Sequence, residues 1–286
     1  MAKKAIYAVI LAACIAGLNG ILIKKMPDLS TGAIAWFRAG IPVLFLLPGL
    51  IRANDFKVSG NYKMLLLASG INALRMYFYL IAFIYTSIGN AVVLFYIYPL
   101  FVTIIESLIY KTPIKKTQIY LMLLAFIGIV FTYINKPFSF ESKDFIGMLA
   151  ALLAAVGYAF FVSLFKRQTG HCNRNQLLFY QNIAGAVLFL PFLFGIESPP
   201  AEELGIAVFY ALLIGILVFS LFFFGLKHLN ATTAASLMYL EILSAIIYSY
   251  FLLGEKLTWN TYVGGSLILI SSFFISRINK TATSES

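Results

Sequence analysis

Residues 64–110, with the sequence MLLLASGINALRMYFYLIAFIYTSIGNAVVLFYIYPLFVTIIESLIY, decide the fold of this chain. The stretch is almost continuously apolar. A single α-helix covering it would be about 70 Å long, more than twice the ~30 Å hydrocarbon core of a bilayer. The turn-forming sequence TSIGN at 86–90 therefore predicts a break, with one membrane-spanning helix on each side of it.

The same pattern extends over the whole chain, outward from this stretch. Hydrophobic residues make up 61% of the 286 residues and charged residues only 11%, against about 25% charged in soluble domains. So few charges cannot cover a water-soluble surface. The sequence predicts an all-α integral membrane protein with ten transmembrane helices. The predicted spans are 5–23, 31–51, 64–86, 88–110, 117–135, 144–165, 176–196, 204–228, 231–253 and 258–277.

The lysines and arginines beside these spans indicate the orientation. With the N-terminus inside, 14 of the 21 lie on the inner side, 5 on the outer side, and Arg38 and Arg75 lie within spans. Basic residues accumulate on the cytoplasmic side of membrane proteins. We therefore expect a protein of the bacterial cytoplasmic (inner) membrane, in contact with its lipids, with both termini in the cytoplasm. The net charge of +10 is then an orientation signal and does not indicate nucleic-acid binding.

An internal repeat becomes visible when the chain is compared with itself at an offset of 143 residues. The span boundaries coincide, and so do Ala91/Ala234, Leu94/Leu237, Tyr96/Tyr239, Leu100/Leu243 and Ile104/Ile247. Since five crossings are an odd number, two such halves must have opposite orientations in the bilayer. We expect a first repeat at 1–140 and a second at 141–286, forming one membrane domain. Inverted repeats are typical of secondary transporters, whose site lies near the midplane between the halves.

Short motifs along the whole chain resemble the drug/metabolite transporter superfamily, specifically its ten-helix EamA type. They are AWFRAG at 35–40, YLIAFIYTS at 79–87, PLF at 99–101, LLGEKLT at 252–258 and YVGG at 262–265. The resemblance implies that spans one to four and six to nine surround a central cavity, and that spans five and ten are peripheral. It also implies export as the direction, and a role in the fold for Arg38. The chain departs from the family at 110–113, where YKTP replaces a Gly-Glu-basic turn.

Ionisable side chains within spans are candidates for function because each costs about 2.5–3.5 kcal/mol on insertion scales. Arg38, Arg75 and Glu241 qualify. Glu106 lies near the inner end of its span, and we expect it to reach the membrane surface. Arg75 and Glu241 lie near the midplane, one in each half. Two interpretations remain open: a structural ion pair between the halves, or a site where arginine binds an anionic group and Glu241 an amine or a proton.

Other polar and aromatic residues in the spans complete the candidate substrate site. Tyr98 occupies the repeat position of Glu241, and helical spacing places Asn72 and Tyr79 on the face of Arg75. The full set of candidate substrate-binding residues is Asn19, Arg38, Asn72, Arg75, Tyr79, Tyr98, Tyr158, Gln181 and Glu241. Such a mixture suits a partly hydrated cavity for an organic molecule. The alternative is that the tyrosines serve only in helix packing.

The sequence therefore predicts a secondary transporter that moves a small organic metabolite by alternating access. An amino acid or a similar zwitterion is the expected substrate, because arginine and glutamate at one depth complement a carboxylate and an amine. Transport is expected to be facilitative or proton-coupled export. The alternative is a membrane scaffold or a lipid-modifying protein without transport.

Other functions lack the residues they need. His171 lies between predicted spans and His228 at the loop-side end of one. The sequence contains no HExxH motif, no phosphate-binding loop and only two cysteines. We expect no enzymatic activity, cofactor, metal site or nucleic-acid partner, and we favour a monomer.

The orientation predicts which loops are accessible from outside the cell. Single cysteines are introduced at Ser142 and at Ser284 in a Cys14→Ser, Cys172→Ser background, and intact cells are treated with an impermeant maleimide. Ser142→Cys should be labelled and Ser284→Cys should not, because the charge count places the 136–143 loop outside and the C-terminus inside. The opposite labelling pattern would reverse the orientation.

Overall fold

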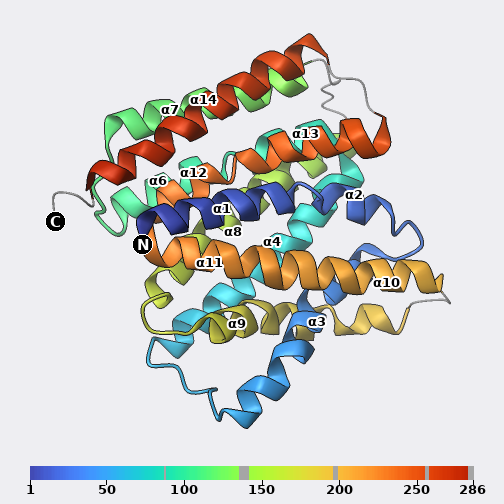
Figure 1. Ribbon diagram of the computed structural model, residues 1–286. Helices are drawn as coiled ribbons and strands as arrows, with labels where there is room; N and C mark the ends of the chain where they lie inside the picture. The colour runs from blue at the N-terminus through green and yellow to red at the C-terminus, as the bar shows by residue number, and fades with distance from the viewer. Residues whose placement is uncertain (87, 135–141, 196–198, 255–257, 283–286) are drawn as a thin grey trace.

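The computed structural model describes the chain except for residues 87, 135–141, 196–198, 255–257 and 283–286. In the described part all regular structure is helical, and the helices form one bundle (Figure 1). The predicted boundary between halves at 140/141, the centre of the 252–258 motif and Ser284 lie outside the described residues.

The predicted break within 64–110 is confirmed. Helix α4 (Tyr62–Tyr85) begins after Asn61, whose side chain accepts a hydrogen bond from the backbone N–H of Met64. It ends at Thr86, whose backbone is extended at φ −127° and ψ 168°. The next helix, α5, covers Ile88–Phe95 and is followed by α6 (Tyr98–Leu108). The long apolar run therefore folds back on itself, as the bilayer thickness requires.

The remaining predicted spans also fall on helices. These helices are α1 (Ala2–Ala16), α2 (Asn19–Lys24), α3 (Thr31–Arg52), α7 (Lys116–Tyr133), α8 (Ser142–Gln168), α9 (Arg174–Leu188), α10 (Ala201–Tyr210), α11 (Phe219–His228), α12 (Ala231–Leu237), α13 (Leu240–Leu253) and α14 (Trp259–Ala282). A 3₁₀ turn, η1 (Leu190–Leu193), follows α9, and a π-helix, η2 (Ala211–Val218), joins α10 to α11.

Eight helical stretches in the described part are long and apolar enough to cross a membrane. The two predicted spans outside this set are those of α9 and α14. Helix α9 has only 15 residues, about 22 Å at 1.5 Å per residue. Helix α14 is long enough, with 24 residues, but it carries serines and Arg277 among its apolar residues. The count of ten crossings stays a prediction.

Three of the spans are interrupted near their middle. The interruptions are Gly17-Leu18 between α1 and α2, Tyr96-Ile97 between α5 and α6, and Met238-Tyr239 between α12 and α13. At Pro99 the cause is local, because proline has no N–H to donate to the carbonyl of Phe95. At the other two breaks, Leu18 and Tyr239 donate to the carbonyl three residues back, at 3.1 and 3.2 Å, which tightens the turn there.

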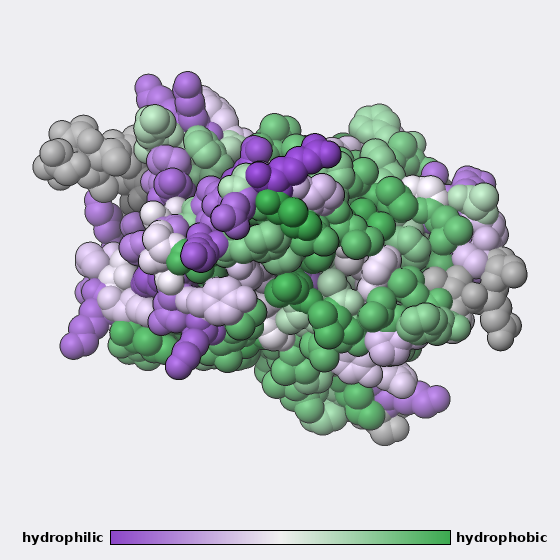
Figure 2. All heavy atoms as spheres, turned by 90° about the horizontal axis from the view of Figure 1, so that it is seen from below, coloured by the Kyte–Doolittle hydropathy of each residue, from purple (hydrophilic) through white to green (hydrophobic). Residues whose placement is uncertain are grey.

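On one face of the bundle, hydrophilic side chains gather mainly at one end, and apolar side chains cover the middle (Figure 2). We call the end where α1 begins and where α8, α11 and α14 finish the terminal end; it lies on the left in Figure 1. Figure 2 shows hydrophobic side chains across the middle of one face and hydrophilic ones gathered mainly toward the left. Large apolar residues such as Phe45, Leu108 and Phe251 are exposed. An exposed apolar band of this kind is stable only in contact with lipid.

Helices α7 and α14 pack against each other at the edge of the bundle (Figure 1). Their backbones meet at two glycines: a Cβ on Gly264 would lie 2.3 Å from the Gly128 carbonyl oxygen, and one on Gly128 would lie 2.7 Å from that of Gly264. Small residues permit such close approach between membrane helices.

Candidate functional site

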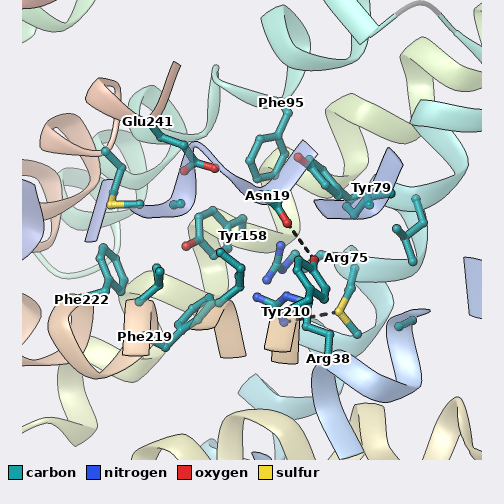
Figure 3. Close-up of a pocket in the computed structure, with 18 of the residues that line it drawn as sticks. Asn19, Arg38, Arg75, Tyr79, Phe95, Tyr158, Tyr210, Phe219, Phe222 and Glu241 are labelled. Carbon is teal, nitrogen blue, oxygen red and sulfur yellow. Dashed lines mark hydrogen bonds between the residues drawn. The ribbon is translucent and has the colours of Figure 1, made fainter. Parts of the chain in front are cut away.

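A cavity lies in the centre of the bundle and in its half away from the terminal end. Its empty volume is about 760 Å³, which includes the opening to solvent. Figure 3 shows the side chains that surround it. The lining residues are Ala16, Asn19, Ile23, Ile34, Ala35, Arg38, Arg75, Met76, Tyr79, Leu80, Phe95, Tyr98, Tyr158, Tyr210, Ile214, Val218, Phe219, Phe222, Met238 and Glu241.

Seven of the nine residues selected from the sequence line this cavity. They are Asn19, Arg38, Arg75, Tyr79, Tyr98, Tyr158 and Glu241. Asn72 and Gln181 do not line it and lie behind Arg75. Asn72 donates from Nδ2 to the Gln181 backbone carbonyl at 2.9 Å. The Gln181 side chain is buried, and its amide has no hydrogen-bond partner among the described residues.

Arg75 is held rigidly by α4 and α8. Its Nε and Nη2 donate to Asn72 Oδ1 at 3.0 and 2.8 Å, one turn earlier on α4. Its guanidinium carbon lies 4.4 Å from the centre of the Tyr158 ring, a favourable cation–π geometry. Gly157 makes this approach possible, since a Cβ there would lie 2.7 Å from Arg75 Cβ.

Arg38 reaches the same part of the cavity from α3. Its Nη1 lies 3.5 Å from Met76 Sδ, a weak acceptor, and its guanidinium carbon lies 5.1 Å from the centre of the Phe219 ring. Figure 3 shows the two guanidinium groups side by side. Among the described residues no carboxylate is within ion-pair distance of either arginine. The cavity therefore presents two cations that the protein itself does not neutralise.

Glu241 lies across the cavity from the arginines (Figure 3). It is in the first turn of α13, directly after the break in that span. A helix N-terminus favours a negative charge. The side chain is only partly buried, because it faces the cavity, and it interacts with the Tyr96 hydroxyl. Arg75 and Glu241 form no ion pair within the part of the chain described here, so the structural ion-pair interpretation is not supported.

Aromatic rings form the wall between the two charged regions. Tyr158 packs edge-to-face on Tyr98, with ring centroids 4.7 Å apart, and stacks on Phe95 at 5.7 Å. Tyr79 packs edge-to-face on Phe95 at 4.8 Å. Tyr98 is only 1% exposed, so most of its surface serves helix packing. Flat apolar surfaces of this kind suit the body of an organic molecule.

Tyr210 is a lining residue that sequence reasoning missed. Its hydroxyl donates to Asn19 Oδ1 at 2.8 Å, which joins α10 to α2 beside the arginines. The feature of the sequence that could have identified it is that Tyr210 is the sole tyrosine in the predicted span 204–228. The π-helix that follows it was not readable from the sequence, although such segments are frequent at functional sites. Phe219 and Phe222, also missed, line the cavity beyond this π-helix.

A metal site is not evident in the described part of the chain, where no three His, Cys, Asp or Glu side chains are grouped to hold an ion. The chemistry available is therefore that of two guanidiniums, one carboxyl group, amides and phenols. Groups of these kinds can bind and orient a charged organic molecule.

Comparison with known proteins identifies the same transporter family in both halves of the chain. The sequence profile of the EamA-like transporter family matches residues 3–134 and again 145–277. The "Uncharacterized transporter YoaV" of Bacillus subtilis (strain 168) is 25% identical over 263 residues, covering 88% of each protein. The S-adenosylmethionine uptake transporter of Rickettsia bellii is 26% identical and covers 88% of this chain and 86% of its own.

Two further similarities are more distant. The biotin transporter of Escherichia coli (strain K12) is 22% identical over 245 residues, covering 84% of this chain and 81% of its own. One solved protein structure superposes with a TM-score of 0.78 at 16% identity, covering 94% of this chain and 96% of that one. At such low identity this structural match shows a shared fold only.

The contacts of Arg75 predict that Asn72 stabilises the fold. Asn72→Leu removes the single oxygen that accepts two hydrogen bonds from the buried Arg75 guanidinium, and a hydrogen bond to a charged group contributes about 1.5–3 kcal/mol. The variant should unfold at a clearly lower temperature in detergent. Asn182→Leu is the matched control, because among the described residues the buried Asn182 side chain makes one neutral hydrogen bond, from Nδ2 to the Leu178 carbonyl at 2.9 Å, whose loss costs less than that of two hydrogen bonds to a cation. Equal melting temperatures for the two variants would contradict the assigned role of Asn72.

Proposed function

The chain belongs to the EamA-like transporter family, and from this membership we propose that it is a secondary transporter for a small organic carboxylate. An amino acid or a similar zwitterion is the first candidate. The named relatives are transporters of small molecules, so the family points to transport and away from enzymatic chemistry.

The charges of the cavity support a carboxylate substrate. In the part of the chain that the structure describes, no carboxylate lies within ion-pair distance of Arg38 or Arg75, and each guanidinium can donate several parallel hydrogen bonds. A substrate carboxylate placed between them would accept from both. Glu241 across the cavity would then receive an amine, a cation or a hydrogen-bond donor of the same molecule. This arrangement of two cations facing one carboxyl group is the observation on which the proposal rests.

The substrates named for two relatives have this chemistry in common. S-adenosylmethionine and biotin, named for the Rickettsia bellii and Escherichia coli transporters, both carry a carboxylate. S-adenosylmethionine also carries an ammonium group and an aromatic base, which would suit Glu241 and the ring-lined wall. These similarities support a carboxylate as the group that the substrates have in common. We expect the aromatic wall of the cavity to select the rest of the substrate molecule.

We further propose ten crossings arranged as two inverted halves. The family profile matches twice, at 3–134 and 145–277, which supports a repeat. The breaks at Tyr96-Ile97 and Met238-Tyr239 fall within one residue of each other at the offset of 143. Helix α9 with η1 covers residues 174–193, about 30 Å and thus the thickness of the hydrocarbon core.

The proposed orientation has both termini in the cytoplasm of a bacterial cell, with the protein in the cytoplasmic membrane. The excess of basic residues beside the spans on that side supports it. The cavity would then face the outer side in this structure. An exporter releases its substrate from such a state, so the geometry is compatible with proposed export, coupled to protons or facilitative.

The proposal predicts that Arg38 is required for carboxylate recognition. Proteoliposomes are tested for counterflow of a labelled amino-acid mixture, with S-adenosylmethionine and biotin as separate probes. Arg38→Met should raise the concentration needed for half-maximal exchange about 10- to 100-fold, because a charge-assisted contact contributes about 1.5–3 kcal/mol.

The matched control is Arg52→Met, the same change at the exposed end of the same helix, which should exchange normally. Amide or methyl-ester analogues of a transported acid should compete poorly. Normal exchange by Arg38→Met, or equal competition by acid and amide, would contradict the carboxylate proposal.

The proposal also assigns proton coupling to Glu241. Glu241→Gln keeps the shape and the hydrogen bonding of the side chain but cannot bind and release a proton. It should fold normally, since Arg75 keeps its contacts with Asn72 and Tyr158. It should still exchange substrate at equal concentrations but lose accumulation driven by a pH gradient. Accumulation at the wild-type level would exclude this role.

A further inference from the structure

The route from the cavity to the terminal end is closed by aromatic side chains. Phe161 and Phe165 of α8 and Phe223 of α11 are fully buried, one or two turns beyond the lining residues Tyr158 and Phe219. Phe222 of α11 is also fully buried and lies where this aromatic layer meets the cavity. The rings of Phe165 and Phe223 stack with centroids 5.3 Å apart. A solute in the cavity cannot pass toward the terminal end unless α8 moves relative to its neighbours.

A polar cluster covers this aromatic layer at the terminal end. Arg167 Nη2, at the end of α8, donates to Glu106 Oε2 of α6 at 2.8 Å. The Arg167 guanidinium carbon lies 3.8 Å from the centre of the Tyr110 ring. Thr112 donates from Oγ1 to Glu106 Oε2 at 3.2 Å and from its backbone N–H to the Glu106 carbonyl at 2.8 Å. We call Glu106, Tyr110, Thr112 and Arg167 the latch.

The structure corrects the expectation that Glu106 reaches the membrane surface. Its side chain is only 3% exposed, whereas that of Arg167 is 28% exposed, so the carboxylate points inward and the arginine covers it. Glu106 belongs to the first family match and Arg167 to the second. The latch therefore joins the two halves of the chain at the end opposite the cavity.

Lys166, next to Arg167, connects the end of α8 to a different helix. Lys166 donates from Nζ to the backbone carbonyls of Leu226 and Leu229 at 2.6 and 2.7 Å, at the end of α11. Lys166 thus holds α8 to another helix of the second half, while Arg167 holds it to the first half. When the halves separate at this end, the contact of Arg167 must break and that of Lys166 can persist.

The energetics of a buried ion pair suit a contact that opens and closes. The attraction between the charges roughly offsets the cost of removing both from water. If the terminal end opens, water solvates both groups and recovers much of that cost. Such a pair favours the closed state modestly, whereas removal of one partner leaves a buried charge unpaired and favours the open state.

We propose that the latch holds the terminal end shut while the cavity faces the opposite end, and that its rupture accompanies opening toward the terminal end. The inference deepens the proposed function, because it rests on alternating access to the same cavity. The latch thereby controls which side of the membrane the cavity can reach.

Two reporter cysteines test the inference without any substrate. Ser163 is fully buried on α8, one turn before Arg167, and reports on the terminal end. Ile23 lines the cavity near the opposite end. Each is replaced by cysteine in a Cys14→Ser, Cys172→Ser background, and maleimide labelling rates are measured in nanodiscs. Cys172 is removed even though burial raises the pKa of its thiol to about 11 and makes it slow to react.

Glu106→Gln and Arg167→Met should each speed the labelling of Ser163→Cys about tenfold and slow that of Ile23→Cys, because population moves between two states. Thr112→Val, which removes one hydrogen bond, should produce a smaller change in the same directions. The matched control is Glu203→Gln, the same change at a buried glutamate that accepts from the Asp28 backbone N–H at the opposite end. It should not speed Ser163→Cys.

Unchanged rates in a folded Glu106→Gln or Thr112→Val protein would overturn the inference. So would faster labelling of both reporters, since that pattern indicates loosened packing and not a change of state. The transport proposal is judged separately, because counterflow that fails with a normal labelling response counts against the substrate assignment alone.

Discussion

The cost of holding two guanidinium groups inside a hydrocarbon layer governs the centre of this molecule. Neither Arg38 nor Arg75 has an ion-pair partner among the described residues. Their charge is stabilised instead by the Asn72 amide oxygen and by the faces of Tyr158 and Phe219. These partners satisfy only some of the guanidinium donors and do not cancel the charge. The aromatic wall, the glycine at 157 and the amides behind Arg75 all follow from that requirement.

Much of the fold could be predicted because bilayer thickness acts on sequence directly. The length of the apolar runs and the turn residues at 86–90 were enough to place the helices and the break after Tyr85. The interruption at Tyr96 has a local cause in Pro99. Those at Gly17 and Met238 were not predicted, because they involve contacts between distant segments; a Cβ on Gly17, for example, would lie 2.2 Å from Ser244 Oγ. Local composition does not encode such contacts.

The candidate site could be predicted in part, because polar side chains are rare within membrane spans. Arg38, Arg75 and Glu241 stood out on that ground and do line one cavity. Gln181 stood out equally but lies behind it, since a polar residue can also face another helix. The expectation that Glu106 reaches the membrane surface was wrong, because the position of a residue along a helix does not show which way its side chain points. Its partner, Arg167, lies 61 residues away in the sequence. Tyr210 was missed because a tyrosine in a span is ordinary.

The glycine contact between α7 and α14 has a consequence for how the protein is made. Helix α7 ends at Tyr133, whereas α14 begins only at Trp259 and is therefore synthesised well after α7. Until then the Gly128 surface of α7 has no partner of its own chain and must be covered by lipid or by an insertion factor. This edge of the bundle is therefore completed only after α14 has been made, and a chain truncated before Trp259 would leave the Gly128 surface without the contact that α14 provides.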